Sequence, residues 1–175
     1  MTDEEKLKKA FDIYENFERD LDDIKKHSKS YAQLMWEIME NKEAIYYSPT
    51  GKRTMIYIRD RIRFAEVTGL GPPTYDRIKY DKFDWVPGIR TFMTLCMIYQ
   101  LNITMVRELR HSYGYDFNPQ NQLHQAYVYL LVNCRGKSLS YCNKVLKALK
   151  VKKENYLGNK AIDEDVAKAE ALNDI

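Results

Sequence analysis

The sequence predicts an all-α fold, and three observations support this prediction. Apolar residues recur at spacings of three and four over long stretches, as they do on one face of an α-helix. Only seven glycines and five prolines occur in 175 residues, so those stretches are rarely interrupted. Strand-like alternation of apolar and polar residues is brief and local. The length suits about one compact domain with appendages.

The composition is that of a globular protein, with 45% hydrophobic and 30% charged residues. No apolar run approaches the roughly 18 residues of a membrane helix, and the N-terminus lacks the apolar stretch of a secretory signal. We therefore expect a cytoplasmic protein that does not contact membranes. Cys96, Cys134 and Cys142 form no CxxC pair, so the sequence predicts neither a disulfide framework nor a metal or other cofactor.

Residues 1–52 are expected to form an N-terminal helical extension. A first amphipathic helix is predicted over residues 3–27, and its apolar stripe packs either on the chain's own core or on a second copy. The stripe consists of Leu7, Ala10, Phe11, Tyr14, Phe17, Leu21 and Ile24. A second helix is predicted over residues 30–47, with Ser30 as its N-cap. The segment SPTGK, residues 48–52, has the composition of a turn.

Residues 53–117 are expected to form the central domain. One helix is predicted over 53–68, and Gly69 follows it where a helix needs a left-handed terminator. Pro72 and Pro73 then begin a helix that reaches residue 80, because a first-turn proline loses no hydrogen bond. Two further helices are predicted over 87–100 and 102–113.

Residues 118–157 are predicted to form a C-terminal pair of helices, at 119–133 and 138–149. The turn CRGK separates the two. The outer side of the second helix is cationic, because residues 135–153 contain seven basic and no acidic residues. That surface is either solvated or a second contact with a polyanion. Residues 158–175 form an acidic tail.

Residues 61–83, RIRFAEVTGLGPPTYDRIKYDKF, contain an ordered motif. A small residue in a first helix precedes a glycine by four positions, an apolar residue follows the glycine, and two apolar residues three apart lie in a second helix. These are Ala65, Gly69, Leu70, Tyr75 and Ile78. This order resembles the helix-turn-helix of the phage-repressor (Cro/repressor, or XRE) family. The helices predicted over 87–100 and 102–113 resemble the fourth and fifth helices of such domains. More loosely, the C-terminal part looks like an extension found after such domains in bacterial and phage proteins.

The resemblance implies a repressor-like helix-turn-helix bundle that binds double-stranded DNA, as bacterial and phage transcription regulators do. The second motif helix would enter the major groove, where Arg77 is the best candidate for a guanine contact and Thr74 assists it. The sequence departs from the family at Pro72 and Pro73, which have no side-chain donor or acceptor. Asp76 is also repelled by phosphate, unless it accepts a hydrogen bond from a cytosine or orients Arg77.

Basic residues near the motif are candidates for phosphate contacts, because residues 52–110 contain eleven basic and six acidic residues. Three candidates lie before or in the first motif helix, namely Arg53, Arg61 and Arg63. Three others flank the end of the second motif helix, namely Lys79, Lys82 and Arg90. Lys52 and Arg59 belong to the same group. The alternative is that these side chains are solvated or are paired with acids, namely Glu66, Asp76, Asp81 and Asp84.

A second hypothesis is a protein-interaction or dimerisation module that keeps the repressor-like scaffold and no longer reads bases. The two prolines and Asp76 favour it, and the fourteen tyrosines would suit an interface, although most are expected in the core. Catalysis finds little support, because the histidines are scattered and HExxH, GxSxG, Walker and dinucleotide patterns are absent from the sequence. The sequence therefore predicts a protein that is not an enzyme.

Overall fold

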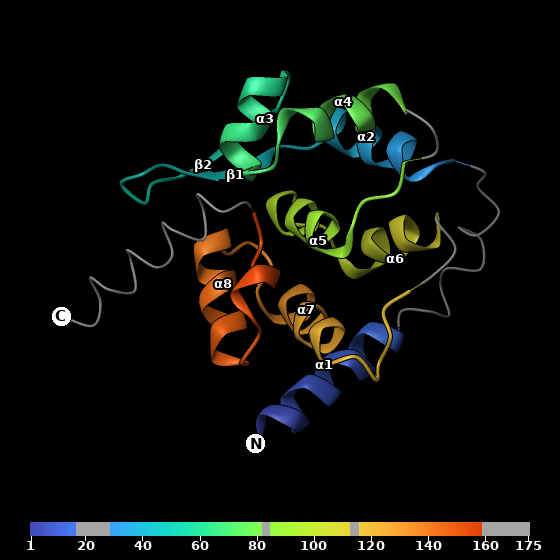
Figure 1. Ribbon diagram of the computed structural model, residues 1–175, viewed down its shortest axis with the longest axis vertical. Coiled ribbons are helices and arrows are strands. Elements are labelled where there is room, and N and C mark those ends of the chain that lie inside the picture. The colour runs from blue at the N-terminus through green and yellow to red at the C-terminus, as the bar shows by residue number, and fades with distance from the viewer. Residues whose placement is uncertain (17–28, 82–84, 113–115, 159–175) are drawn as a thin grey trace.

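The computed structural model describes residues 1–16, 29–81, 85–112 and 116–158, which form a mostly helical structure with one small antiparallel sheet (Figure 1). The first elements are α1 (Asp3–Asn16), α2 (Tyr31–Asn41), β1 (Ala44–Tyr47), β2 (Arg53–Ile56), α3 (Arg61–Thr68) and α4 (Pro72–Tyr80). They are followed by α5 (Ile89–Ile98), α6 (Ile103–His111), α7 (Gln122–Asn133) and α8 (Leu139–Ala148). A short 3₁₀ turn, Lys153–Asn155, ends the described chain's secondary structure.

The helices after Gly71 lie close to where the sequence predicts them. The bounds of α4 are those expected, and α5 to α8 begin and end within three residues of the predicted limits. Ser30 is the N-cap of α2 and forms a reciprocal capping box with Gln33, as its position predicted. The predicted first helix is present over Asp3–Asn16, whereas residues 17–27 and the tail from residue 159 lie outside the described residues.

The predicted helices over 30–47 and 53–68 are partly wrong, because the mostly helical fold also contains one small two-stranded sheet in this region. The chain leaves α2 at Lys42, which is extended with φ −131° and ψ 137°. The next residues, AIYY, pair antiparallel with Arg53–Ile56, in the register Ala44 to Ile56 and Tyr47 to Arg53. β-branched and aromatic residues favour a strand, and Gly51 at φ 85° closes the turn between the two strands. Helix α3 begins only at Arg61, after the N-cap Asp60.

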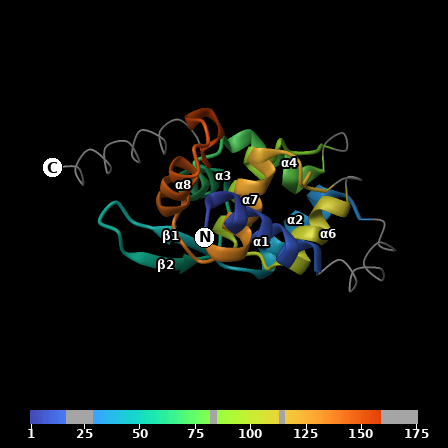
Figure 2. The same ribbon diagram turned by 90° about the horizontal axis from the view of Figure 1, so that it is seen from below.

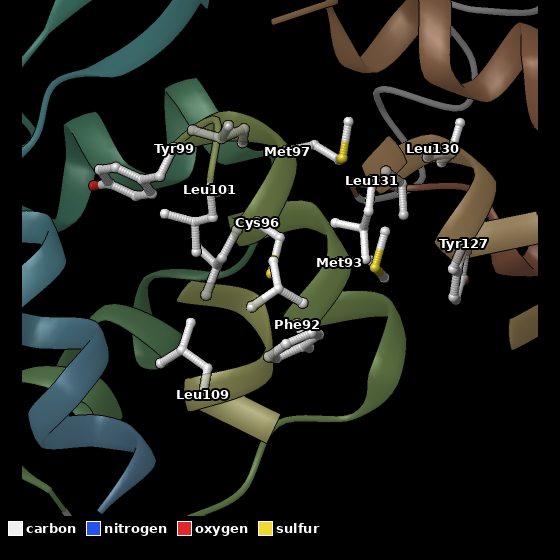
Figure 3. Packing of buried hydrophobic residues seen from close by; sticks show 14 of the residues in the cluster. Phe92, Met93, Cys96, Met97, Tyr99, Leu101, Leu109, Tyr127, Leu130 and Leu131 are labelled. Carbon is white, nitrogen blue, oxygen red and sulfur yellow. The ribbon is translucent and has the colours of Figure 1, made fainter. Parts of the chain in front are cut away.

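The core is built around α5, in which every residue from Phe92 to Ile98 is buried. In Figure 3 its Phe92, Met93, Cys96 and Met97 lie among side chains of neighbouring elements, including those of α7. One hydrophobic cluster extends from Phe11 to Leu157. It therefore includes side chains from all three predicted segments, 1–52, 53–117 and 118–157, and this division remains a prediction.

The apolar stripe of α1 packs on the chain itself over the described residues. Ala10, Phe11 and Tyr14 are buried, and α1 lies against α7 (Figures 1 and 2). The Tyr14 hydroxyl donates to Asp116 Oδ1 at 2.7 Å, and Arg107 Nη2 lies 2.7 Å from Asp116 Oδ2. This part-buried group joins α1 to α6 and to the segment that leads into α7.

Among the described residues, no helix combines the length and the apolar character needed to cross a bilayer.

Candidate nucleic-acid interface

Helices α3 and α4 are joined by a short turn that the local sequence explains. Gly69 ends α3 at φ 70°, and its N–H donates to the Ala65 carbonyl at 2.9 Å. The buried Thr68 hydroxyl donates to the Phe64 carbonyl at 2.7 Å and accepts from the Leu70 N–H at 3.0 Å. Both ends of the turn are thus held by hydrogen bonds, which sets the direction in which α4 leaves it.

Helix α4 is seated on α2 and α3 by aromatic contacts. Tyr75 and Ile78 are buried, with exposed fractions of 3% and 1%. The Tyr75 ring lies 5.7 Å from the Trp36 ring of α2 and 5.5 Å from the Phe64 ring of α3. The first contact is edge-to-face and the second is tilted, and aromatic pairs of this kind add stability beyond the burial of area. The inner side of α4 is therefore firmly placed.

The outer side of α4 presents Pro73, Arg77 and Tyr80, spaced by four and three residues, to solvent. Within the described residues the Arg77 guanidinium forms no hydrogen bond or ion pair. Thr74 is half-buried beside it. Arg77 is therefore the polar side chain of α4 that is most available to a ligand.

Asp76 is held by Arg61. Arg61 Nε lies 3.0 Å from Asp76 Oδ2, and this ion pair joins the first turn of α3 to the middle of α4. Arg63 likewise pairs with Glu66, at 3.1 Å, and its guanidinium lies over the Tyr46 ring at 5.2 Å. Arg61 and Arg63 are thus paired with acids, which the sequence analysis left open as the alternative to phosphate contact.

Lys79 lies in the last turn of α4, with its ammonium group 5.3 Å from the centre of the Tyr80 ring and 6.0 Å from that of Trp36. The side chain remains exposed, because a cation over an aromatic face keeps much of its contact with water. Lys82, the next predicted phosphate contact, lies outside the described residues.

Arg53 and Arg90 lie apart from α3 and α4. Arg53 is exposed on β2, and its Nη2 donates to Gln100 Oε1 at 3.5 Å. Arg90 lies in the first turn of α5, where its Nε donates to the Tyr156 carbonyl and ties the segment after α8 to the core. Helices α3 and α4 thus bring together six of the nine predicted residues: Arg61, Arg63, Thr74, Asp76, Arg77 and Lys79.

The N-terminus of α4 offers little to an anion. Its first two residues, Pro72 and Pro73, have no N–H, and the Thr74 N–H donates to the Gly71 carbonyl at 3.0 Å. Phosphate binding at a helix N-terminus depends on free backbone donors in the first turn. Any ligand of α4 must therefore be recognised by side chains.

Ile62 is a surface feature that the sequence analysis did not single out. It lies in the first turn of α3 with an exposed fraction of 80%, and Tyr80 at the end of α4 is 59% exposed. Helical spacing could have predicted the exposure of Ile62, because Phe64, Val67 and Thr68 define the inner side of α3 and Ile62 lies outside it.

The remaining chemistry of the described residues is that of a core. Burial raises the pKa of the Cys96 and Cys142 thiols, which keeps both protonated. In the part of the chain that the structure describes, no three His, Cys, Asp or Glu side chains are grouped to hold a metal ion.

Comparisons with protein-family models, with curated proteins and with solved structures give no match for this chain.

Proposed function

We propose that this chain is a helix-turn-helix DNA-binding protein of the repressor-like type, a bacterial or phage transcription regulator that acts in the cytoplasm. The observation that carries the proposal is the pair α3–α4, in which Tyr75 and Ile78 anchor the second helix while Arg77 stays exposed on its outer side. An exposed, anchored helix with a free guanidinium is what reading of the major groove requires.

The proposed roles follow from the positions of the side chains. Arg77 donates to guanine in the major groove, with Thr74 beside it. Lys79 in the last turn of the reading helix and Lys82 after it contact phosphates. Arg61 and Arg63 contact phosphates from α3 once their carboxylate partners release them. We leave Arg90 out of the interface, because its guanidinium is engaged with the Tyr156 carbonyl.

Fluorescence anisotropy with labelled duplexes, random and genomic, tests the proposal over a series of salt concentrations. We expect salt-sensitive binding that favours some sequences. Arg77→Ala should weaken binding of the favoured duplexes by about 1–3 kcal/mol and should reduce the preference. Lys9→Ala, which removes one exposed charge from α1, is the matched control and should change little. Absence of binding at low salt would sink the proposal.

A second candidate function is a protein-interaction or homodimerisation module on the same scaffold. The exposure of Ile62 and Tyr80 on the α3–α4 pair favours it, as does the lack of backbone donors at the start of α4. Apolar contacts are not screened by salt, so such a complex should survive high salt and weaken in Ile62→Ser. Light scattering and pull-down experiments that both return only a monomer would exclude it.

A further inference from the structure

Gln100 lies between two cations that come from separate parts of the chain, Arg53 and Arg135. It follows α5 in a left-handed conformation, with φ 51°. Its backbone carbonyl accepts from Arg135 Nε at 2.7 Å, and its side-chain Oε1 accepts from Arg53 Nη2 at 3.5 Å. We call Arg53 and Arg135, with Gln100 between them, the Gln100 cluster.

Both guanidinium groups of the Gln100 cluster are held by one neutral residue. Burial, and after it the charge of Arg135, lowers the pKa of the nearby Lys42 ammonium group. Within the described residues, no carboxylate forms an ion pair with Arg53 or Arg135. This is the opposite of Arg61 and Arg63, which each hold an acid. Like charges gathered without a counter-charge repel one another, and an anion that binds between them relieves that repulsion.

The backbone around the cluster is well fixed. The Tyr47 hydroxyl of β1 donates to the Gly136 carbonyl at 3.2 Å, which ties the hairpin to the turn that carries Arg135. At the hairpin tip, the Ser48 N–H donates to the Lys52 carbonyl at 3.0 Å, and the Lys52 N–H donates to Ser48 Oγ at 3.1 Å. Cations on such a surface are already in place, so less side-chain and loop freedom is lost when a ligand binds.

The cluster is open to solvent and is separate from the reading helix. Arg53, Thr54 and Met55 of β2 are exposed, and so are Arg135 and Lys52. The hairpin extends away from α4 in both views of the molecule (Figures 1 and 2). A ligand that binds the Gln100 cluster therefore contacts the side of the molecule that carries the hairpin.

We propose that the Gln100 cluster binds the phosphate backbone of duplex DNA and forms a second contact besides α4. The inference rests on the proposed function, since the ligand is the same. The charge of the cluster matches a polyanion, and its guanidinium groups suit phosphate oxygens. Arg53 and Arg135 are both engaged with Gln100, so we assign them to phosphate contact, whose contribution is independent of sequence.

The test compares Arg53→Gln/Arg135→Gln with Lys8→Gln/Lys9→Gln, which removes the same two charges from the exposed side of α1, away from the hairpin in Figure 1. Anisotropy titrations use a preferred and a random duplex over a salt series, and thermal melting checks the fold of each variant. For the cluster variant we expect weaker binding to both duplexes by the same factor and a slope of log K against log salt reduced by about 2. Arg53→Lys/Arg135→Lys should keep the slope of the wild type.

The outcomes separate the inference from the proposed function. If the cluster variant and the control have the same slope while Arg77→Ala loses sequence preference, the inference is overturned and the proposed function stands. If Arg77→Ala changes nothing but the cluster variant loses binding to every duplex, the inference stands and base reading by α4 fails. A wild-type protein that binds no duplex at low salt overturns both.

Discussion

Arg61 and Asp76 form an ion pair between the first turn of α3 and the middle of α4, with 3.0 Å between Arg61 Nε and Asp76 Oδ2. The pair neutralises a carboxylate on the helix proposed to enter the groove, and it also occupies a cation proposed to meet phosphate. Its effect on ligand binding is therefore expected to exceed its effect on the fold.

Replacing Asp76 tests this view. Asp76→Asn frees Arg61, so duplex affinity should rise and the salt slope should steepen by about 1. Stability should change by less than about 1 kcal/mol, because the Arg61 side chain is 56% and the Asp76 side chain 27% exposed. Glu154→Gln makes the same charge change at an exposed site and is the control. Equal gains in the two variants would assign the effect to net charge alone.

The part-buried contact between Tyr14, Asp116 and Arg107 should matter for stability. Arg107 is 2% exposed, and Asp116→Ala removes the carboxylate 2.7 Å from its Nη2. We expect a loss of about 2 kcal/mol in urea unfolding, because the Asp116 side chain is 24% exposed and the buried guanidinium loses one charged partner. Tyr14→Phe removes one hydrogen bond and keeps the ring under Arg107, so its cost should be about 1 kcal/mol. Equal costs for the two variants would contradict this account.

Stability should fall at alkaline pH. Burial is the main cause that raises the pKa of Tyr14, Tyr99 and Tyr127 above the ordinary tyrosine value. In the unfolded chain these hydroxyls lose their protons near pH 10, whereas in the folded chain they keep them. The folded state then binds more protons, so its stability is full below about pH 10 and declines above it. Absorbance at 295 nm and circular dichroism should change together; buried tyrosines that ionise without unfolding would refute the prediction.

Lys150 offers a simple gain in stability. It follows α8 at φ 63°, where a side chain is strained, and the next N–H, that of Val151, donates to the Leu146 carbonyl at 2.9 Å. Lys150→Gly should stabilise the protein by about 1 kcal/mol in thermal or urea unfolding. Lys152→Gly, at an ordinary φ of −66°, should give no gain. If both variants behave alike, the left-handed conformation is not the source of the strain.

The sequence was sufficient where one segment determines its own structure. Apolar spacing, prolines and caps predicted α4 to α8, and the order from Ala65 to Ile78 predicted the turn at Gly69. It failed at residues 44–56, because a four-residue apolar run such as AIYY suits either a helix end or a strand. Only pairing with β2 decides between the two.

The candidate site was predictable in the same uneven way. The exposure of Arg77 follows from the helical positions of Tyr75 and Ile78, which face inward. The engagement of Arg90 with Tyr156 joins residues 66 positions apart, and the meeting of Arg53 with Arg135 at Gln100 depends on how the hairpin packs. Neither contact leaves a local pattern in the sequence from which it could be predicted.

The contact between Trp36 and Tyr75 gives the molecule its own optical probe. Trp36 lies half-buried on α2, and its indole touches the ring that anchors α4 and has the Lys79 ammonium nearby. Indole emission responds to nearby charge and water, so movement of Lys79 toward a ligand changes its intensity and wavelength. The chain's other tryptophan, Trp85, packs on Tyr31. In Trp85→Phe a single tryptophan, excited selectively over the fourteen tyrosines, reports directly on the underside of the proposed reading helix.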